Sequence, residues 1–104
     1  MERDILNTIM EYLWYNKIMA WRNNTTGVYD PTKKVFRKMP KHTRKGVPDI
    51  IGIYKGKFLG IEVKQPGKYP SKEQREFIAE ALENGGIAFV ARSLDDVKLF
   101  LSKY

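Results

Sequence analysis

Hydrophobic side chains recur near the start of the chain at the spacing of an α-helix. The apolar positions that carry this pattern are Ile5, Leu6, Ile9, Met10 and Leu13. They predict an amphipathic helix over residues 3–17. Residues 18–22 read as a first strand, and the Asn, Thr and Gly residues at 23–27 read as a turn. The pattern therefore predicts a helix that lies with one face against a sheet.

Two further strands are predicted in the middle of the chain. Residues 49–54 and 58–64 are rich in β-branched and aromatic residues, and three residues separate them, which predicts a β-hairpin. A two-residue turn places Asp49 opposite Glu62, whereas a three-residue loop without a bulge places them on opposite faces. Lys55-Gly56 is not a favoured two-residue turn, so a β-bulge is the alternative device. We predict that the two acids meet and leave the device open.

The last third of the chain predicts a helix, a strand and a helix. Ser71 precedes a helix over residues 72–84, residues 87–91 form a buried strand, and Ser93 caps the final helix. The expected buried stripe of the first of these helices is Phe77, Ile78, Ala81 and Leu82. Passage from strand through helix to strand predicts one parallel pair in an otherwise antiparallel sheet. We therefore predict a mixed α/β fold in which helices flank about four strands, in the order αβββαβα.

Positive charge is concentrated in one continuous third of the chain. Between Pro31 and Lys68 there are 11 basic and 2 acidic residues, against 8 and 10 in the remainder. Much of this excess lies in a loop over residues 28–47, with a short β excursion around Val35-Phe36. Such a loop is either a solvated surface or a contact with a polyanion such as nucleic acid. The candidate DNA contacts are Lys33, Lys34, Arg37, Lys38, Lys41, Arg44, Lys45 and Lys68.

Composition excludes several kinds of protein. The 104 residues fit one domain over 1–104, and 42% hydrophobic residues favour a folded core. The chain has no cysteine and one histidine, which excludes disulfide frameworks, thiolate metal sites and histidine-rich sites. No apolar run approaches the roughly 18–20 residues that span a bilayer. Acidic residues at positions 2 and 4 do not fit a secretory leader, so we expect a cytoplasmic protein without membrane contact.

Two acids interrupt the basic third of the chain. Glu62 and Lys64 share one side of a predicted strand, and Asp49 opens the strand before it. Two carboxylates this close repel each other unless a cation or a proton lies between them, and oxygen ligands suit Mg²⁺ or Mn²⁺. Lys64 can orient a water molecule or neutralise charge on a phosphoryl oxygen. This combination favours hydrolysis of a phosphodiester.

Each of these residues also has a purely structural interpretation. An aspartate after a proline fits ordinary turn chemistry, and an acid and a lysine two residues apart fit an exposed ion pair. Glu2 fits the helix dipole in a first turn, although its place on the apolar stripe directs it toward the sheet. Gln74 completes a capping box with Ser71, which by itself explains a glutamine at that position.

The combination resembles a known nuclease signature. Pro48-Asp49 followed by Glu62-Val63-Lys64 resembles the PD-(D/E)xK motif, and the element order is similar to the core of that superfamily. More specifically, nearly the whole chain resembles the VRR-NUC family. The residues that carry this closer resemblance are Gly46-Val47-Pro48-Asp49, Glu62-Val63-Lys64, Gly67, Ser71-Lys72-Glu73-Gln74, Trp21-Arg22-Asn23 and the helix that begins with Glu2.

The resemblance implies a Mg²⁺- or Mn²⁺-dependent deoxyribonuclease. The implied catalytic residues are Asp49, Glu62, Lys64, Gln74 and Glu2. The implied metal ligands are Asp49, Glu62, the carbonyl of Val63 and Glu2. Compact family members from viruses and bacteria resemble symmetric dimers that cut branched DNA, so the resemblance implies a homodimeric endonuclease acting on Holliday junctions in a bacterial or phage-infected cell.

Three other functions are set against this one. A sequence-specific restriction enzyme is disfavoured because we expect no recognition subdomain in 104 residues. A flap or nicking nuclease uses the same chemistry on a different DNA structure. A non-catalytic nucleic-acid-binding domain on a nuclease fold predicts binding without cleavage, and the intact set of two acids and a lysine argues against it.

Overall fold

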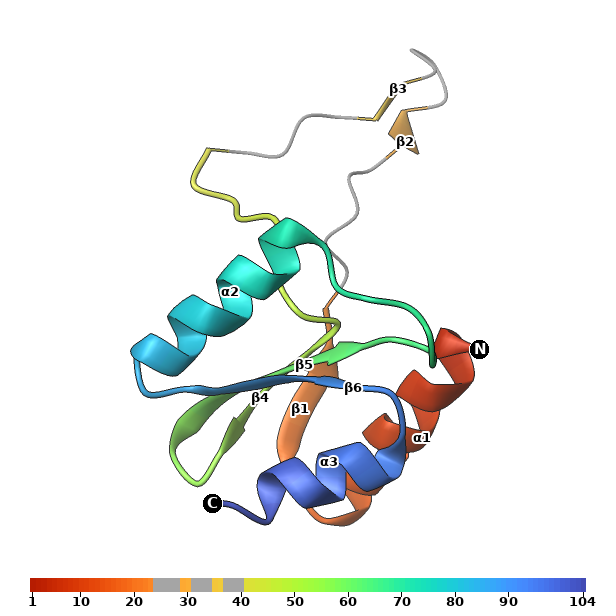
Figure 1. Cartoon of the computed structure of the whole chain (residues 1–104), viewed down its shortest axis with the longest axis vertical. Coiled ribbons are helices and arrows are strands. Elements are labelled where there is room, and N and C mark those ends of the chain that lie inside the picture. Colours follow the sequence, from red (N-terminus) through yellow and green to blue (C-terminus); the bar gives the residue numbers. More distant parts are fainter. Residues whose placement is uncertain (24–28, 31–34, 37–40) are drawn as a thin grey trace.

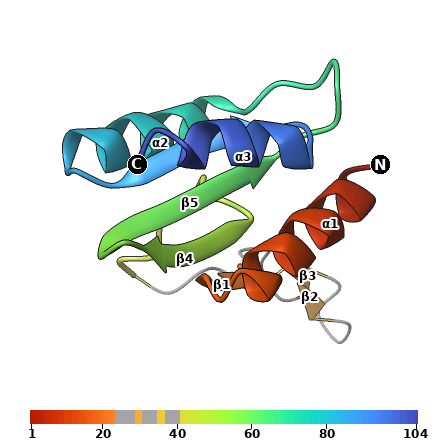
Figure 2. The same cartoon turned by 90° about the horizontal axis from the view of Figure 1, so that it is seen from below.

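The main sheet of the protein has four strands in the order β1-β4-β5-β6. The computed structural model describes residues 1–23, 29–30, 35–36 and 41–104. In Figure 1 the sheet lies between α2 on one side and α1 with α3 on the other; Figure 2 shows the same layers after a quarter turn. The elements are α1 (Glu2–Tyr15), β1 (Met19–Arg22), β2 (Tyr29–Asp30), β3 (Val35–Phe36), β4 (Ile50–Tyr54), β5 (Lys57–Val63), α2 (Lys72–Glu83), β6 (Ile87–Ala91) and α3 (Leu94–Leu101).

The pairing of the strands confirms the predicted mixed sheet. β4 pairs antiparallel with β1 and with β5, whereas β5 and β6 are parallel. α2 makes the crossover between that parallel pair, as expected. The first helix ends at Tyr15 rather than at residue 17, because Lys17 has a φ of 57° that the helix cannot continue through. Among the described residues, no helix is long and apolar enough to cross a membrane.

The hydrophobic core lies on the side of the sheet that carries α1 and α3. Alternate residues of β5, namely Leu59, Ile61 and Val63, are fully buried there, as the period of two in a strand requires. The rings of Phe89 and Phe100 stack with their centroids 4.4 Å apart and join β6 to α3. The remaining buried members of the core are Leu6, Ile9, Met10, Leu13, Ala20, Ile50, Ile87, Ala91, Val97 and Leu101.

Helix α2 covers the other face less completely than its sequence predicts. Phe77, Ile78 and Ala81 are only half-buried, and Leu82 is 48% exposed. Contact with the sheet is made in part by Phe77, whose ring lies 5.9 Å from that of Phe58 on β5, centroid to centroid. The helix lies over β5 and β6 (Figure 1).

A tight turn joins β4 and β5. The ladder runs from Ile50 opposite Ile61 to Tyr54 opposite Lys57. Lys55 and Gly56 connect the strands with φ values of 52° and 79°, as in a two-residue type I′ turn. The alternative of a bulge is therefore not used, and Lys57 belongs to the strand. Continuing this register by one residue places Asp49 opposite Glu62, as predicted.

The small strands β2 and β3 confirm the expected β excursion in the basic loop. Tyr29 pairs with Phe36, and Asp30 pairs with Val35, in an antiparallel ladder. Figure 1 places this ladder away from the main sheet, beyond the end of α2 at which that helix begins. Four of the candidate DNA contacts lie outside the described residues: Lys33, Lys34, Arg37 and Lys38.

Candidate active site

The segment that leads into Asp49 is held by two close packing contacts. Gly46 has a φ of 78°, and a Cβ added there would overlap the backbone carbonyl of Glu73 in the first turn of α2. Pro48 is buried, and its Cγ lies only 3.0 Å from where a Cβ on Gly60 would stand. The glycines therefore let the segment lie between α2 and β5.

Backbone hydrogen bonds then fix Asp49 itself. The Asn23 amide donates to the Asp49 carbonyl at 2.7 Å, and the Asn23 side chain donates to the Pro48 carbonyl at 3.3 Å. The Asp49 carboxylate accepts a hydrogen bond from the Val63 amide through Oδ2 at 2.8 Å. The carboxylate thus binds the backbone at the end of β5. A residue that served only the turn would not make this contact.

Glu62 is the buried acid of this site. It is 2% exposed, and it is the one charged residue that is buried in the described part of the chain. Its Oε1 accepts a hydrogen bond from Gln74 Nε2 at 2.8 Å and lies 3.9 Å from the Lys64 ammonium. Its Oε2 is also buried and meets no donor among the described residues. An exposed ion pair with Lys64 is therefore the wrong interpretation of these two residues.

The surroundings of Glu62 disfavour its charged form. The pKa of Glu62 is raised from 4.5 to about 8, above all by burial, and the neighbouring charge of Asp49 acts in the same direction. Lys64 acts against this rise, and Glu2 adds a small contribution to it. As expected for two facing carboxyl groups, the pair needs a proton or a cation between them.

Gln74 serves the helix and the acid at the same time. Its Oε1 accepts a hydrogen bond from the Ser71 amide at 2.7 Å, and its backbone amide donates one in return to Ser71 Oγ at 3.2 Å, which completes the predicted capping box. Its Nε2 donates to Glu62. The capping interpretation of this glutamine is therefore confirmed, and its side chain also binds the buried acid.

Glu2 approaches the same end of β5 from α1. Its Oε2 accepts a hydrogen bond from the Gln65 amide at 3.5 Å, and Figure 1 shows the start of α1 beside the chain that leaves β5. Within the described ranges, however, no three histidine, aspartate or glutamate side chains gather closely enough to hold a metal ion together. Asp49 and Glu62 are thus a carboxylate pair with Glu2 at its border.

The donor set of this pair fits a hard divalent cation. Both groups offer carboxylate oxygens, and the buried Oε2 of Glu62 has no other partner among the residues described. Mg²⁺ commonly takes one or two carboxylates and keeps several water molecules. A divalent ion would also relieve the repulsion that raises the pKa of Glu62.

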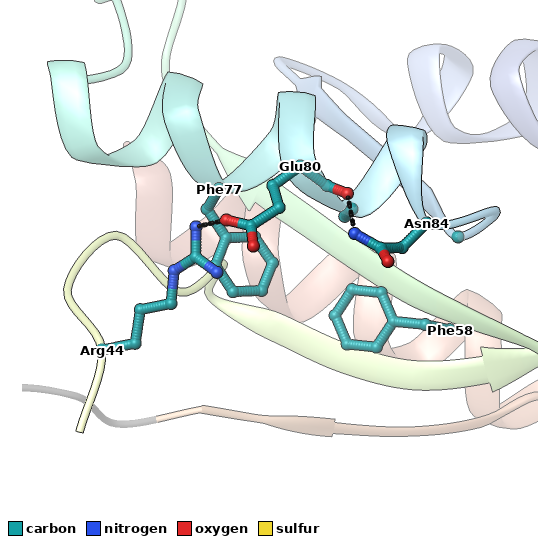
Figure 3. Close-up of a pocket in the computed structure, with 7 residues that line it drawn as sticks. Arg44, Phe58, Phe77, Glu80 and Asn84 are labelled. Carbon is teal, nitrogen blue, oxygen red and sulfur yellow. Dashed lines mark hydrogen bonds and ion pairs between the residues drawn. The ribbon is translucent and has the colours of Figure 1, made fainter. Parts of the chain in front are cut away.

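The basic loop rejoins the domain through Arg44. Its guanidinium lies over the Phe77 ring, 4.8 Å from the centroid, and forms an ion pair with Glu80. Figure 3 shows Arg44 reaching across Phe77 at the mouth of a cavity of about 220 Å³, whose wall includes Phe58 and Asn84. Arg44 therefore anchors the end of the loop to α2. The other described candidate DNA contacts are exposed: Lys41, Lys45 and Lys68.

Arg75 and Arg92 near the site were not singled out by sequence reasoning, and Asn23 was named only as part of the family resemblance. Asn23, Arg75 and Arg92 all donate side-chain hydrogen bonds to backbone carbonyls of segments that carry or border the site. The contacts of Asn23 and Arg92 depend on how segments distant in the sequence meet, and the contact of Arg75 is local. The one available signal was position, because Arg92 directly follows the buried strand β6.

Known proteins resemble this chain in sequence and in fold. Residues 4–95 match the family model of the VRR-NUC domain. A solved structure of a VRR_NUC domain protein superimposes with a TM-score of 0.71 and 23% sequence identity, covering 100% of this chain and 87% of that one. That likeness shows a common fold. No curated protein matches the sequence significantly.

Proposed function

Because the chain belongs to the VRR-NUC domain family, a family of nuclease domains, we propose that it is a Mg²⁺- or Mn²⁺-dependent DNA endonuclease. The observation that carries the proposal is the pairing of the half-buried Asp49 with the buried Glu62 beside Lys64. The proposed substrate is branched DNA such as a Holliday junction, and the proposed assembly is a homodimer that acts in the cytoplasm.

The carboxylate pair is the proposed place of the metal ion. Asp49 and Glu62 would hold it, and the Val63 carbonyl and Glu2 are further oxygen donors at the same end of β5. The bound ion supplies Lewis-acid assistance to phosphodiester hydrolysis. Gln74 keeps Glu62 in one orientation through the 2.8 Å hydrogen bond, so that its carboxylate does not have to be ordered when the ion binds.

Lys64 is the proposed catalytic lysine. Its side chain is only 17% exposed and stands 3.9 Å from Glu62. A partly buried ammonium is effective at neutralising the negative charge that develops on a phosphoryl oxygen, because little water screens it. The exposed lysines at positions 41, 45 and 68 would bind the phosphate backbone without reading bases. A twofold dimer would present two such sites to the two cut strands of a junction.

Metal binding gives a direct prediction. Mn²⁺ or Ca²⁺ should raise the Tm of the protein, because a ligand at 100 times its Kd stabilises the folded state by about 2.7 kcal/mol, on the order of 10 °C for a domain of this size. Asp49→Asn should remove that gain, while Asp95→Asn on α3, whose carboxylate is exposed, should retain it. A metal-dependent rise that persists in Asp49→Asn would contradict the assignment of the site.

The nuclease proposal itself is tested on a panel of DNA structures. Labelled four-way junction, flap, splayed-arm and linear duplex are incubated with the protein and Mg²⁺, and the mass in solution is measured by light scattering. The proposal expects fastest cleavage of the junction and the mass of a dimer. Fastest cleavage of the flap would favour a flap nuclease. Salt-sensitive binding without any cleavage would favour the non-catalytic alternative.

A further inference from the structure

The connection between β5 and α2 begins with a well-formed turn. The Lys68 amide donates to the Gln65 carbonyl at 3.1 Å, with Pro66 and Gly67 between them. Gly67 has a φ of 85°. Proline in the second position and a glycine of positive φ in the third are the features of a type II turn. The chain therefore leaves the active site along a fixed path.

Two arginines hold the backbone on either side of Tyr69. Arg92 donates from Nη2 to the Lys68 carbonyl at 2.9 Å, and Arg75 donates from Nη1 to the Pro70 carbonyl at 2.8 Å. The residue after Pro70 opens the capping box of α2. Tyr69 is thus carried on a short stretch of backbone that is anchored before and after it.

The Tyr69 side chain is nevertheless exposed. It is 78% exposed, and its ring meets the Arg92 guanidinium at 5.4 Å from the centroid. A cation at this distance attracts the face of an aromatic ring. Arg92 therefore holds both the backbone before Tyr69 and the ring itself, and it leaves most of the ring surface open to solvent.

This exposed ring lies at the end of the sheet where the proposed chemistry takes place. Arg92 directly follows Ala91, whose carbonyl accepts a hydrogen bond from the Lys64 amide at 3.0 Å. The exposed Lys68 is the neighbour of Tyr69 in the sequence. An aromatic face among cations is the usual platform for a base of single-stranded nucleic acid, because stacking and phosphate contacts act together.

Resting on the proposed nuclease function, we propose that Tyr69 is a stacking platform for an unpaired nucleobase next to the scissile phosphate. Arg92 and Arg75 are positioning residues that hold this platform. A base at a branch point can expose its face, whereas bases within continuous duplex are covered by their neighbours. The platform therefore contributes selectivity for branched over linear DNA.

A fluorescent base analogue tests the platform without cleavage. Splayed-arm DNA with 2-aminopurine at the first unpaired position is titrated with protein in EDTA, because stacking on an aromatic ring quenches its fluorescence. The wild type should quench the signal. Tyr69→Ala should lose the quench and bind on the order of tenfold more weakly, while Tyr69→Phe should retain both. Tyr15→Ala, an exposed tyrosine at the far end of α1, is the control and should behave as the wild type.

Kinetics on branched DNA test the role of Arg92. Arg92→Ala should raise KM about as much as Tyr69→Ala and leave kcat unchanged, and the combined variant should be no worse than Tyr69→Ala alone, since both changes remove one platform. A fall in kcat at constant KM would overturn the positioning role.

Two results would overturn the platform itself. One is a full quench with Tyr69→Ala, and the other is a Tyr69→Phe variant as weak as Tyr69→Ala, which would assign the effect to the hydroxyl. The proposed nuclease function is tested separately. A normal quench in EDTA without cleavage of any DNA in Mg²⁺ would support the platform and rule out the nuclease activity.

Discussion

Replacing Glu62 with glutamine is expected to abolish DNA cleavage, with a loss on the order of 10³-fold or more in kcat. The amide has the shape of the carboxylate but no charge, so Asp49 is left without its partner in holding a divalent ion. Gln74 can still donate to the new carbonyl oxygen, because that bond ends on Oε1 in the native protein. Single-turnover cleavage of a four-way junction in Mg²⁺ measures the loss, with Glu76→Gln, an exposed acid on α2, as the matched control.

The same substitution is expected to stabilise the metal-free protein at alkaline pH. Glu62 has a pKa of 4.5 in the reference state and about 8 in the folded protein, so the folded state binds the extra proton between these values. The stabilisation from that proton is complete below the lower value and is lost as the pH rises through the upper one. The loss amounts to at most about 1.4 kcal/mol per pH unit. Glutamine does not titrate and removes this slope.

Urea unfolding in EDTA at pH 5.5, 7 and 8.5 separates the two proteins. Glu62→Gln should be the more stable one at pH 8.5, and the difference should shrink toward pH 5.5. Glu76→Gln should follow the wild type at each pH. If Glu62→Gln were less stable than the wild type at pH 8.5, the interpretation of Glu62 as a destabilising buried acid would be wrong.

Replacing Gly46 with alanine is expected to lower the free energy of unfolding by about 2–4 kcal/mol. A residue with a Cβ is strained at the φ of 78° found here, and the added methyl group would overlap the backbone of Glu73 and Gln74. The first turn of α2 would have to move away from the sheet. Because that turn carries the donor to Glu62, the variant should also cleave DNA more slowly.

Gly85→Ala is the matched control for this prediction. Gly85 has a φ of 84°, and a Cβ there would meet no described atom within 4 Å. Its cost is therefore the backbone strain alone, roughly 1–2 kcal/mol. The difference between the two variants in thermal and urea unfolding measures the contact between Gly46 and α2. Equal destabilisation would show that this contact is not tight.

The order of the elements and the mixed sheet could be predicted, because the local periodicity of apolar residues indicates each helix and strand. Leu59, Ile61 and Val63 alternate along one strand, and all three are buried as the alternation requires. The turn at Lys55-Gly56 could not be assigned in the same way, since Lys55 adopts a positive φ that its residue type disfavours. Pairing of the two long strands on either side determines that conformation.

The meeting of the two acids was predictable from strand register, but their environment was not. A two-residue turn at Lys55-Gly56 brings Asp49 opposite Glu62. Whether that face is exposed depends on α2, which lies far along the chain and places Gln74 on Glu62. The clamps made by Asn23, Arg75 and Arg92 end on backbone carbonyls, and a carbonyl carries no residue identity by which a sequence could reveal the pairing.

The two hydrogen bonds of Gln74 restrict which residue can stand there. For capping the helix alone, glutamate would serve as well as glutamine, because only an acceptor oxygen is needed. The second bond requires a donor, since Glu62 offers an oxygen. Glutamate would bring a further negative charge against an acid whose ionisation is already opposed. Glutamine and glutamate are therefore equivalent for capping the helix, but Glu62 on the neighbouring strand requires glutamine.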